Sequence, residues 1–189
     1  MNFVQPIKEK GKIEEIKEYF KSENKWKLYL MFVIGINSSL RISDILTLTW
    51  QDVSIGGQVK KAFKLKEKKT GKWKEVTINR SFAEAIEEYW SHRGKGSGYI
   101  FSSKSNRNKG KPWSRQYAWK ALKRAAKEVG IEDMGTHSLR KTFAYHAYKA
   151  GVALELLMNT LNHSTQAMTL KYIGITGEDV ENVYNTINL

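Results

Sequence analysis

A nine-residue apolar run near the start of the chain places the strongest constraint on its fold. Residues 28–36 read LYLMFVIGI, and the segment 25–37 predicts one buried helix. The run is about half the length that a helix needs to cross a bilayer, which takes roughly 20 residues. The N-terminal residues also lack the apolar core of a signal peptide. We therefore expect a soluble, cytoplasmic protein that is not inserted into a membrane.

Most of the remaining chain also has helical periodicity. Two short runs of alternating character, residues 59–65 and 73–78, flank Thr70-Gly71 and predict a basic β-hairpin over about 59–78. Residues 91–113 are rich in Gly, Ser, Asn and Lys and predict a long loop, interrupted by a short strand over 99–101. Further helices are expected over residues 13–21, 81–90, 115–129, 138–150, 152–161, 166–172 and 178–187.

The charges are segregated along the chain. The sequence has 32 Lys and Arg against 19 Asp and Glu, a net charge of +13. Residues 56–80 have a net charge of +7, residues 93–127 carry eleven basic residues and no acidic one, and residues 151–189 have a net charge of −3. Two basic blocks beside an acidic tail indicate a face that meets a polyanion, either nucleic acid or an anionic membrane surface. The absence of cysteine excludes disulfide scaffolds, zinc fingers and thiol catalysis.

Two segments could each supply an arginine to a phosphate site. His137 and Arg140 lie three residues apart at the start of a predicted helix, where free N–H groups and the helix dipole favour an anion. Arg41 lies between two apolar segments and needs a partner there. Each has a purely structural alternative: a helix-start histidine beside a surface arginine, and an ion pair between Arg41 and Asp44.

Other candidate residues have weaker local signals. His163 ends an apolar helix, where a histidine is usually a cap or a core residue, and nothing local distinguishes Tyr172 from the other eight tyrosines. The hairpin lysines could reach a groove of DNA or protonate a leaving group, or they could protect a solvated sheet edge. These lysines are Lys64, Lys66, Lys68, Lys69, Lys72 and Lys74.

Taken together and in order, these segments resemble the tyrosine recombinase (phage-type integrase) family. The resemblance runs over most of the chain through "LRISDILTLTWQDV", "KKTGKWKEVTI", "HSLRKTFA" and "LNHSTQAMTLKYI". It implies a mainly helical α+β catalytic domain with a small antiparallel three-stranded sheet, covering residues 1–189 as one domain. The catalytic positions that it implies are Arg41, Lys69, His137, Arg140, His163 and Tyr172.

The resemblance also implies the chemistry. Tyr172 would attack a scissile phosphate of double-stranded DNA and form a 3′-phosphotyrosine, while Arg41 and Arg140 bind the phosphoryl oxygens. Lys69 would protonate the departing 5′-oxygen, with His137 as acid or base. His163 would hydrogen-bond or position the phosphate, without metal or cofactor. The protein would be a monomer when free and a homotetramer on paired DNA sites, and a mobile-element origin fits the family.

Three features depart from the family pattern. Asn162 stands where the family usually has Gly in "LGH", and Lys141 stands where a second histidine is common. Arg41 lies too near the start for the family's N-terminal core-binding domain, so we expect that domain to be absent. Either a short stand-alone recombinase or a catalytic fragment would explain this.

Two questions stay open at the level of sequence. A catalytically idle DNA-binding accessory or regulatory protein of the same fold, or an enzyme that only relaxes DNA, would carry the same basic face. The predicted tail helix over about 178–187 has an apolar stripe that could dock on a neighbouring protomer or on its own chain.

Overall fold

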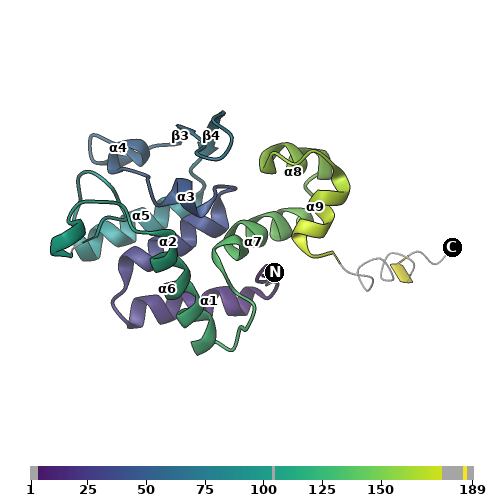
Figure 1. Cartoon of the computed structure of the whole chain (residues 1–189), viewed down its shortest axis with the longest axis horizontal. Helices are drawn as coiled ribbons and strands as arrows, with labels where there is room; N and C mark the ends of the chain where they lie inside the picture. Colours follow the sequence, from purple (N-terminus) through teal and green to yellow (C-terminus); the bar gives the residue numbers. More distant parts are fainter. Residues whose placement is uncertain (1–3, 104, 176–184, 187–189) are drawn as a thin grey trace.

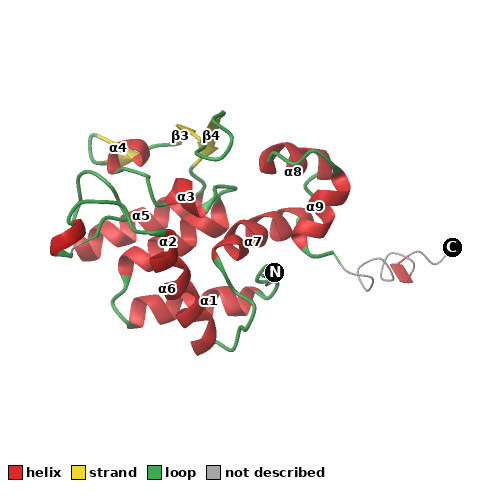
Figure 2. Ribbon diagram, viewed as in Figure 1, coloured by secondary structure: helices red, strands yellow, loops and turns green. Residues whose placement is uncertain are grey.

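The computed structural model describes residues 4–103, 105–175 and 185–186 of the chain, and it is mainly helical (Figures 1 and 2). The helices are α1 (Lys10–Ser22), α2 (Trp26–Asn37), α3 (Ile42–Ile45), α4 (Trp50–Val53), α5 (Arg80–Arg93), α6 (Arg115–Glu128), α7 (Thr136–Lys149), α8 (Leu154–Leu161) and α9 (Gln166–Ile173). The strands are β1 (Ser54–Ile55), β2 (Gln58–Val59), β3 (Ala62–Lys66) and β4 (Trp73–Thr77), and a short 3-10 helix covers Asn106–Asn108. The expected mainly helical α+β fold is confirmed.

Helix α2 forms the centre of the core, as its apolar sequence predicts. Its side chains Leu30, Met31, Phe32 and Ile34 are fully buried, and α1, α5 and α7 pack against it. Burying one such side chain stabilises the fold by roughly 1.5–3 kcal/mol, so this helix anchors the elements around it. Within the described ranges, none of the helices has the length and apolar character needed to span a bilayer.

A glycine in α2 allows α7 to approach closely. A Cβ atom at Gly35 would lie 2.5 Å from Cδ1 and 2.9 Å from Cβ of Leu139 on α7. Leu139 directly precedes Arg140, and α2 ends four residues before Arg41. The contact therefore sets the distance between the two segments that carry the predicted arginines.

Replacing Gly35 with Ala is expected to lower the free energy of unfolding by about 1–3 kcal/mol, because an overpacked contact forces the helices apart. Urea unfolding measures the change. Gly11→Ala in α1 is the matched control, since no atom lies within 4 Å of the position where its Cβ would stand. It should be neutral or stabilising by up to about 1 kcal/mol. Equal midpoints for the two variants would contradict this account of the α2–α7 contact.

The predicted hairpin forms, but the expected three-stranded sheet is wrong. In the described part of the chain, β3 pairs with β4 and β1 pairs with β2 in two separate two-stranded antiparallel sheets. Gly56 and Gly57 both have positive φ and close a tight two-residue turn between β1 and β2. The predicted strand 59–65 is interrupted at Lys60 and Lys61, which leaves Val59 in β2 and the rest in β3. The expected strand at 99–101 is reduced to an isolated bridge between Tyr99 and Thr49.

Helices α8 and α9 lie together at one end of α7, away from α1 (Figure 1). They share a small apolar cluster with that end of α7, built on Ala144, Leu161 and Ile173. The cluster is separate from the main core, so the end of the chain that carries His163 and Tyr172 is packed as its own unit. Most of the predicted tail helix, 178–187, falls outside the described residues.

Candidate active site

Arg41 directly precedes α3, and its guanidinium faces the turn that follows β3. Its Nη1 atom lies 2.9 Å from Oε1 of Glu67, whose side chain is fully buried. The structural alternative for Arg41, an ion pair with Asp44, is not the pairing observed. Asp44 instead accepts a hydrogen bond from the backbone N–H of Lys68 at 3.0 Å. Both buried carboxylates therefore bind the lysine-rich turn to the start of α3.

Arg140 is buried in α7 and connects two chain segments. One terminal nitrogen donates to the carbonyl oxygen of Ser39, and the other donates to the carbonyl oxygen of Leu161 at 2.7 Å. Burial lowers the pKa of Arg140; the nearby Tyr172 side chain opposes this effect, and the charge of Arg41 adds to it. An arginine stays protonated despite such shifts, so the two guanidinium groups form one region of positive charge.

Tyr172 is half-buried on α9, close to both arginines. Its ring meets that of His163 edge to face, with centroids 4.9 Å apart, and the ammonium of Lys141 lies 5.3 Å from the ring centroid. Burial raises the pKa of Tyr172, whereas the charges of Arg140 and Arg41 act in the opposite direction. The phenol is therefore protonated at neutral pH and needs a base if it is to become a nucleophile.

One histidine contacts this phenol, and a second lies near the two arginines. His163 is held by a contact of 3.1 Å between its Nδ1 and Oγ1 of Thr169, and burial followed by the charge of Arg140 lowers its pKa. His137 lies in the first turn of α7 and is partly exposed to solvent. Partial burial lowers the pKa of His137, and the charges of Arg140, Lys141, Lys69 and Arg41 lower it further. Both rings are neutral at pH 7, so either one could accept a proton.

Two hairpin lysines lie near the arginines in different settings. Lys69 is exposed in the β3–β4 turn, and its charge reaches His137. Lys74 lies on β4, where its Nζ atom donates to the carbonyl oxygen of Thr160 at 2.6 Å. Burial, followed by the charge of Arg140, lowers the pKa of Lys74 to about 8. The hairpin thus presents one exposed and one partly enclosed ammonium group.

The structure brings all six predicted residues into one region formed by α3, the β3–β4 turn, α7, α8 and α9. A cavity of about 630 Å³ opens beside it between β4 and α8, with Lys74 and Asn162 in its wall. Sequence reasoning did not assign Glu67 to the site, and it named Lys74 only as one of six candidate lysines in the hairpin. The signal for Lys74 was its register, since it shares the inner face of β4 with buried Val76. The signal for Glu67 was that it is the one acid within a run of lysines.

The comparisons with known proteins define the class. The family model described as the phage integrase family matches residues 9–178, and the chain belongs to this family. It is a tyrosine recombinase by class, as its sequence resemblance predicted.

Individual relatives agree with this assignment. The chain is 41% identical over 184 residues to the Bacillus subtilis (strain 168) protein named probable integrase/recombinase YoeC, covering 97% of each chain. It is 30% identical to tyrosine recombinase XerC of Roseiflexus castenholzii, covering 82% of this chain but 48% of the relative. The chain thus spans about half the length of that longer relative.

Solved structures show the same fold. The crystal structure of XerA recombinase superposes with a TM-score of 0.74 at 17% identity, covering 98% of this chain and 65% of that one. XerH site-specific recombinase, bound to its palindromic difH substrate, gives a TM-score of 0.70 at 18% identity, covering 92% of this chain and 50% of that one.

Proposed function

We propose that this chain cleaves and rejoins double-stranded DNA at specific sites, with Tyr172 as the nucleophile. The observation that carries the proposal is the placement of the buried Tyr172 hydroxyl where the charges of both Arg140 and Arg41 act on it. Negative charge develops on the phosphoryl oxygens during transfer, and two fixed guanidinium groups stabilise it most where water is partly excluded. A phenol beside them is suited to in-line attack on the same phosphorus.

The proton movements of the proposed step balance. The phenol oxygen forms a bond to phosphorus as its proton passes to neutral His137, and the bond from phosphorus to the 5′-oxygen breaks. Lys69 then supplies a proton to that oxygen, leaving a free 5′-hydroxyl, while His163 hydrogen-bonds the phosphate. The phosphotyrosine bond retains the energy of the phosphodiester, so the reverse reaction rejoins strands without a cofactor or metal.

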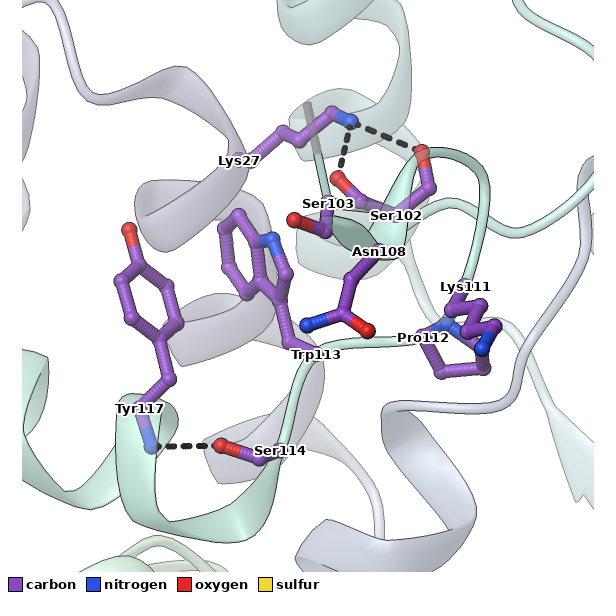
Figure 3. Close-up of a pocket in the computed structure, with 9 residues that line it drawn as sticks. All are labelled: Lys27, Ser102, Ser103, Asn108, Lys111, Pro112, Trp113, Ser114 and Tyr117. Carbon is purple, nitrogen blue, oxygen red and sulfur yellow. Dashed lines mark hydrogen bonds between the residues drawn. The ribbon is translucent and has the colours of Figure 1, made fainter. Parts of the chain in front are cut away.

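A second concave surface supports DNA binding beyond the catalytic residues. It lies at the start of α6 and has a volume of about 590 Å³ (Figure 3). Lys27 donates to the backbone and hydroxyl oxygens of Ser102, both at 3.2 Å, and Trp113 and Tyr117 also line the surface. Apart from Lys27, the residues that line this surface belong to the block 93–127, which has no acidic residue. Such a surface suits contacts to the DNA backbone.

The proposed assembly follows from strand exchange. Two DNA sites of two half-sites each require four active sites, so we propose a homotetramer on paired DNA and a monomer in its absence. Residues 1–189 would act as a single catalytic domain. Because its substrate would be cellular DNA, we also propose a cytoplasmic location.

A covalent trapping assay tests the proposal. A library of duplexes from the DNA around the gene, each nicked next to a candidate scissile phosphate, lets the short 5′-hydroxyl fragment diffuse away after cleavage. The wild-type protein is expected to form a denaturant-resistant adduct on the 3′ side, and peptide mass spectrometry should find the nucleotide on Tyr172. Specific binding without an adduct on any member would instead indicate a DNA-binding accessory protein.

A further inference from the structure

Glu67 has an unusual environment for an acid in a lysine-rich turn. The neighbouring Lys66, Lys68 and Lys69 are exposed, whereas the Glu67 side chain has 0% exposure. Burial is the largest single influence on the pKa of Glu67 and acts to raise it. The hydrogen bond from Thr70, the ion pair with Arg41 and the charge of Lys74 together outweigh burial and lower the pKa. A buried carboxylate that stays ionised needs several partners, and each of its partners here belongs to a different part of the site.

The carboxylate joins three elements. Its Oε1 atom lies 2.9 Å from Nη1 of Arg41. Its Oε2 atom accepts hydrogen bonds from the Thr70 hydroxyl at 2.7 Å and from the Asn162 amide at 3.0 Å. The backbone closes the same turn, because Glu67 N–H donates to the carbonyl of Lys72 at 2.9 Å and Gly71 N–H donates to that of Glu67 at 2.8 Å.

Asn162 is placed for this contact by the end of α8. It adopts the left-handed conformation with φ of 52°, a region that favours Gly and tolerates Asn. A glycine could hold that backbone but has no side chain to reach Glu67. Since His163 follows directly, the amide contact fixes the turn that carries Lys69 relative to the α8–α9 unit that carries His163 and Tyr172.

We propose that Glu67 and Asn162 form a clasp, a pair of positioning residues that assembles the Lys69 turn on Arg41 before DNA binds. This inference rests on the proposed function of Tyr172 and Lys69. Full burial and the three partners indicate a fixed support behind Arg41. An exposed anion that merely occupied the place of the phosphate would be displaced by DNA.

Glu67→Gln removes the ion pair while keeping the shape of the side chain, and it tests the clasp. Single-turnover cleavage at saturating DNA is expected to slow on the order of 10²-fold, because displacement by about 1 Å of a catalytic group has effects of this size. The dissociation constant for DNA should change by only a few-fold, since many phosphate contacts share it. Asn162→Gly should slow cleavage in the same way but less.

The matched control for Asn162→Gly is Asn24→Gly. Asn24 has the same left-handed conformation, with φ of 55°, and its side chain also accepts hydrogen bonds, from Trp26 and Arg93. It lies before α2, outside the site, so this variant should cleave DNA at the wild-type rate. If both glycine variants slowed cleavage equally, the effect of Asn162→Gly would be explained by general destabilisation, and the positioning role of Asn162 would be wrong.

A double-mutant cycle separates positioning from stability. If the clasp acts through the lysine turn, Glu67→Gln should slow cleavage about tenfold or less in a Lys69→Ala background. The proposal would be wrong if Glu67→Gln slowed cleavage by the same factor in both backgrounds, or if the Glu67→Gln protein cleaved DNA faster than the wild type. Absence of an adduct with the wild-type protein would instead count against the proposed function itself.

Discussion

Replacing Tyr172 with Phe is expected to abolish the covalent DNA adduct and to slow strand cleavage by at least about 10⁴-fold. The substitution removes one oxygen atom and leaves the ring against His163 and Lys141. Neither of these contacts involves the hydroxyl, so the fold and the positions of Arg41 and Arg140 should be unchanged. The loss would therefore report chemistry alone. Gel analysis under denaturing conditions measures the adduct, and a shift assay measures DNA binding, which should stay within a few-fold.

Tyr145→Phe is the control for this loss. Tyr145 lies on α7 with its ring beside His146 and near Lys8 and Lys149, and it has no place in the proposed reaction. The adduct yield of Tyr145→Phe should equal that of the wild type. The free energies of unfolding of both variants should lie within about 1 kcal/mol of the wild-type value. If the Tyr172→Phe protein still formed the adduct, another side chain would have to be the nucleophile.

The helices could be predicted because their local sequence patterns agree with the way in which they pack in the folded protein. The apolar run in α2 has few solutions other than burial, and Ser114 and Gly130 mark the ends of α6 through a side-chain cap and a positive φ. The sheet was harder to predict. Gly56-Gly57 is a hairpin turn whose flanking strands have only two residues each, too few to show an alternating pattern.

The site residues that lie in motifs could be predicted from the order of those motifs along the chain. The residues that act through contacts between distant segments could not. Local sequence offered Asp44 as the partner of Arg41, three residues away. The observed partner, Glu67, lies 26 positions further along the chain and is brought in by the hairpin. An acid within a run of lysines is conspicuous in the sequence, but nothing local shows that its side chain is buried. Similarly, the Asn162 amide acquires its role only when α8 and the β3–β4 turn meet.

A substrate with a modified leaving group can show whether Lys69 or Lys74 is the general acid. A 5′-bridging phosphorothiolate, with sulfur in place of the departing oxygen, leaves without a proton. Thiols have a pKa of about 8.5, against about 15.7 for water as a reference for hydroxyl groups. A variant that lacks the general acid should therefore recover on the sulfur substrate. A variant with any other defect should be slow on both substrates.

Lys69→Ala is expected to slow cleavage of the oxygen substrate by about 10²–10⁴-fold and to cleave the sulfur substrate within a few-fold of the wild-type rate. Lys74→Ala should be slowed by the same factor on both substrates. Its ammonium holds the carbonyl of Thr160, next to the Leu161 carbonyl that binds Arg140, so its loss disturbs the end of α8. Recovery of Lys74→Ala but not of Lys69→Ala would make Lys74 the acid. Its pKa of about 8 would then suit proton donation near neutral pH, and the exposed Lys69 would be left with DNA contact as its role.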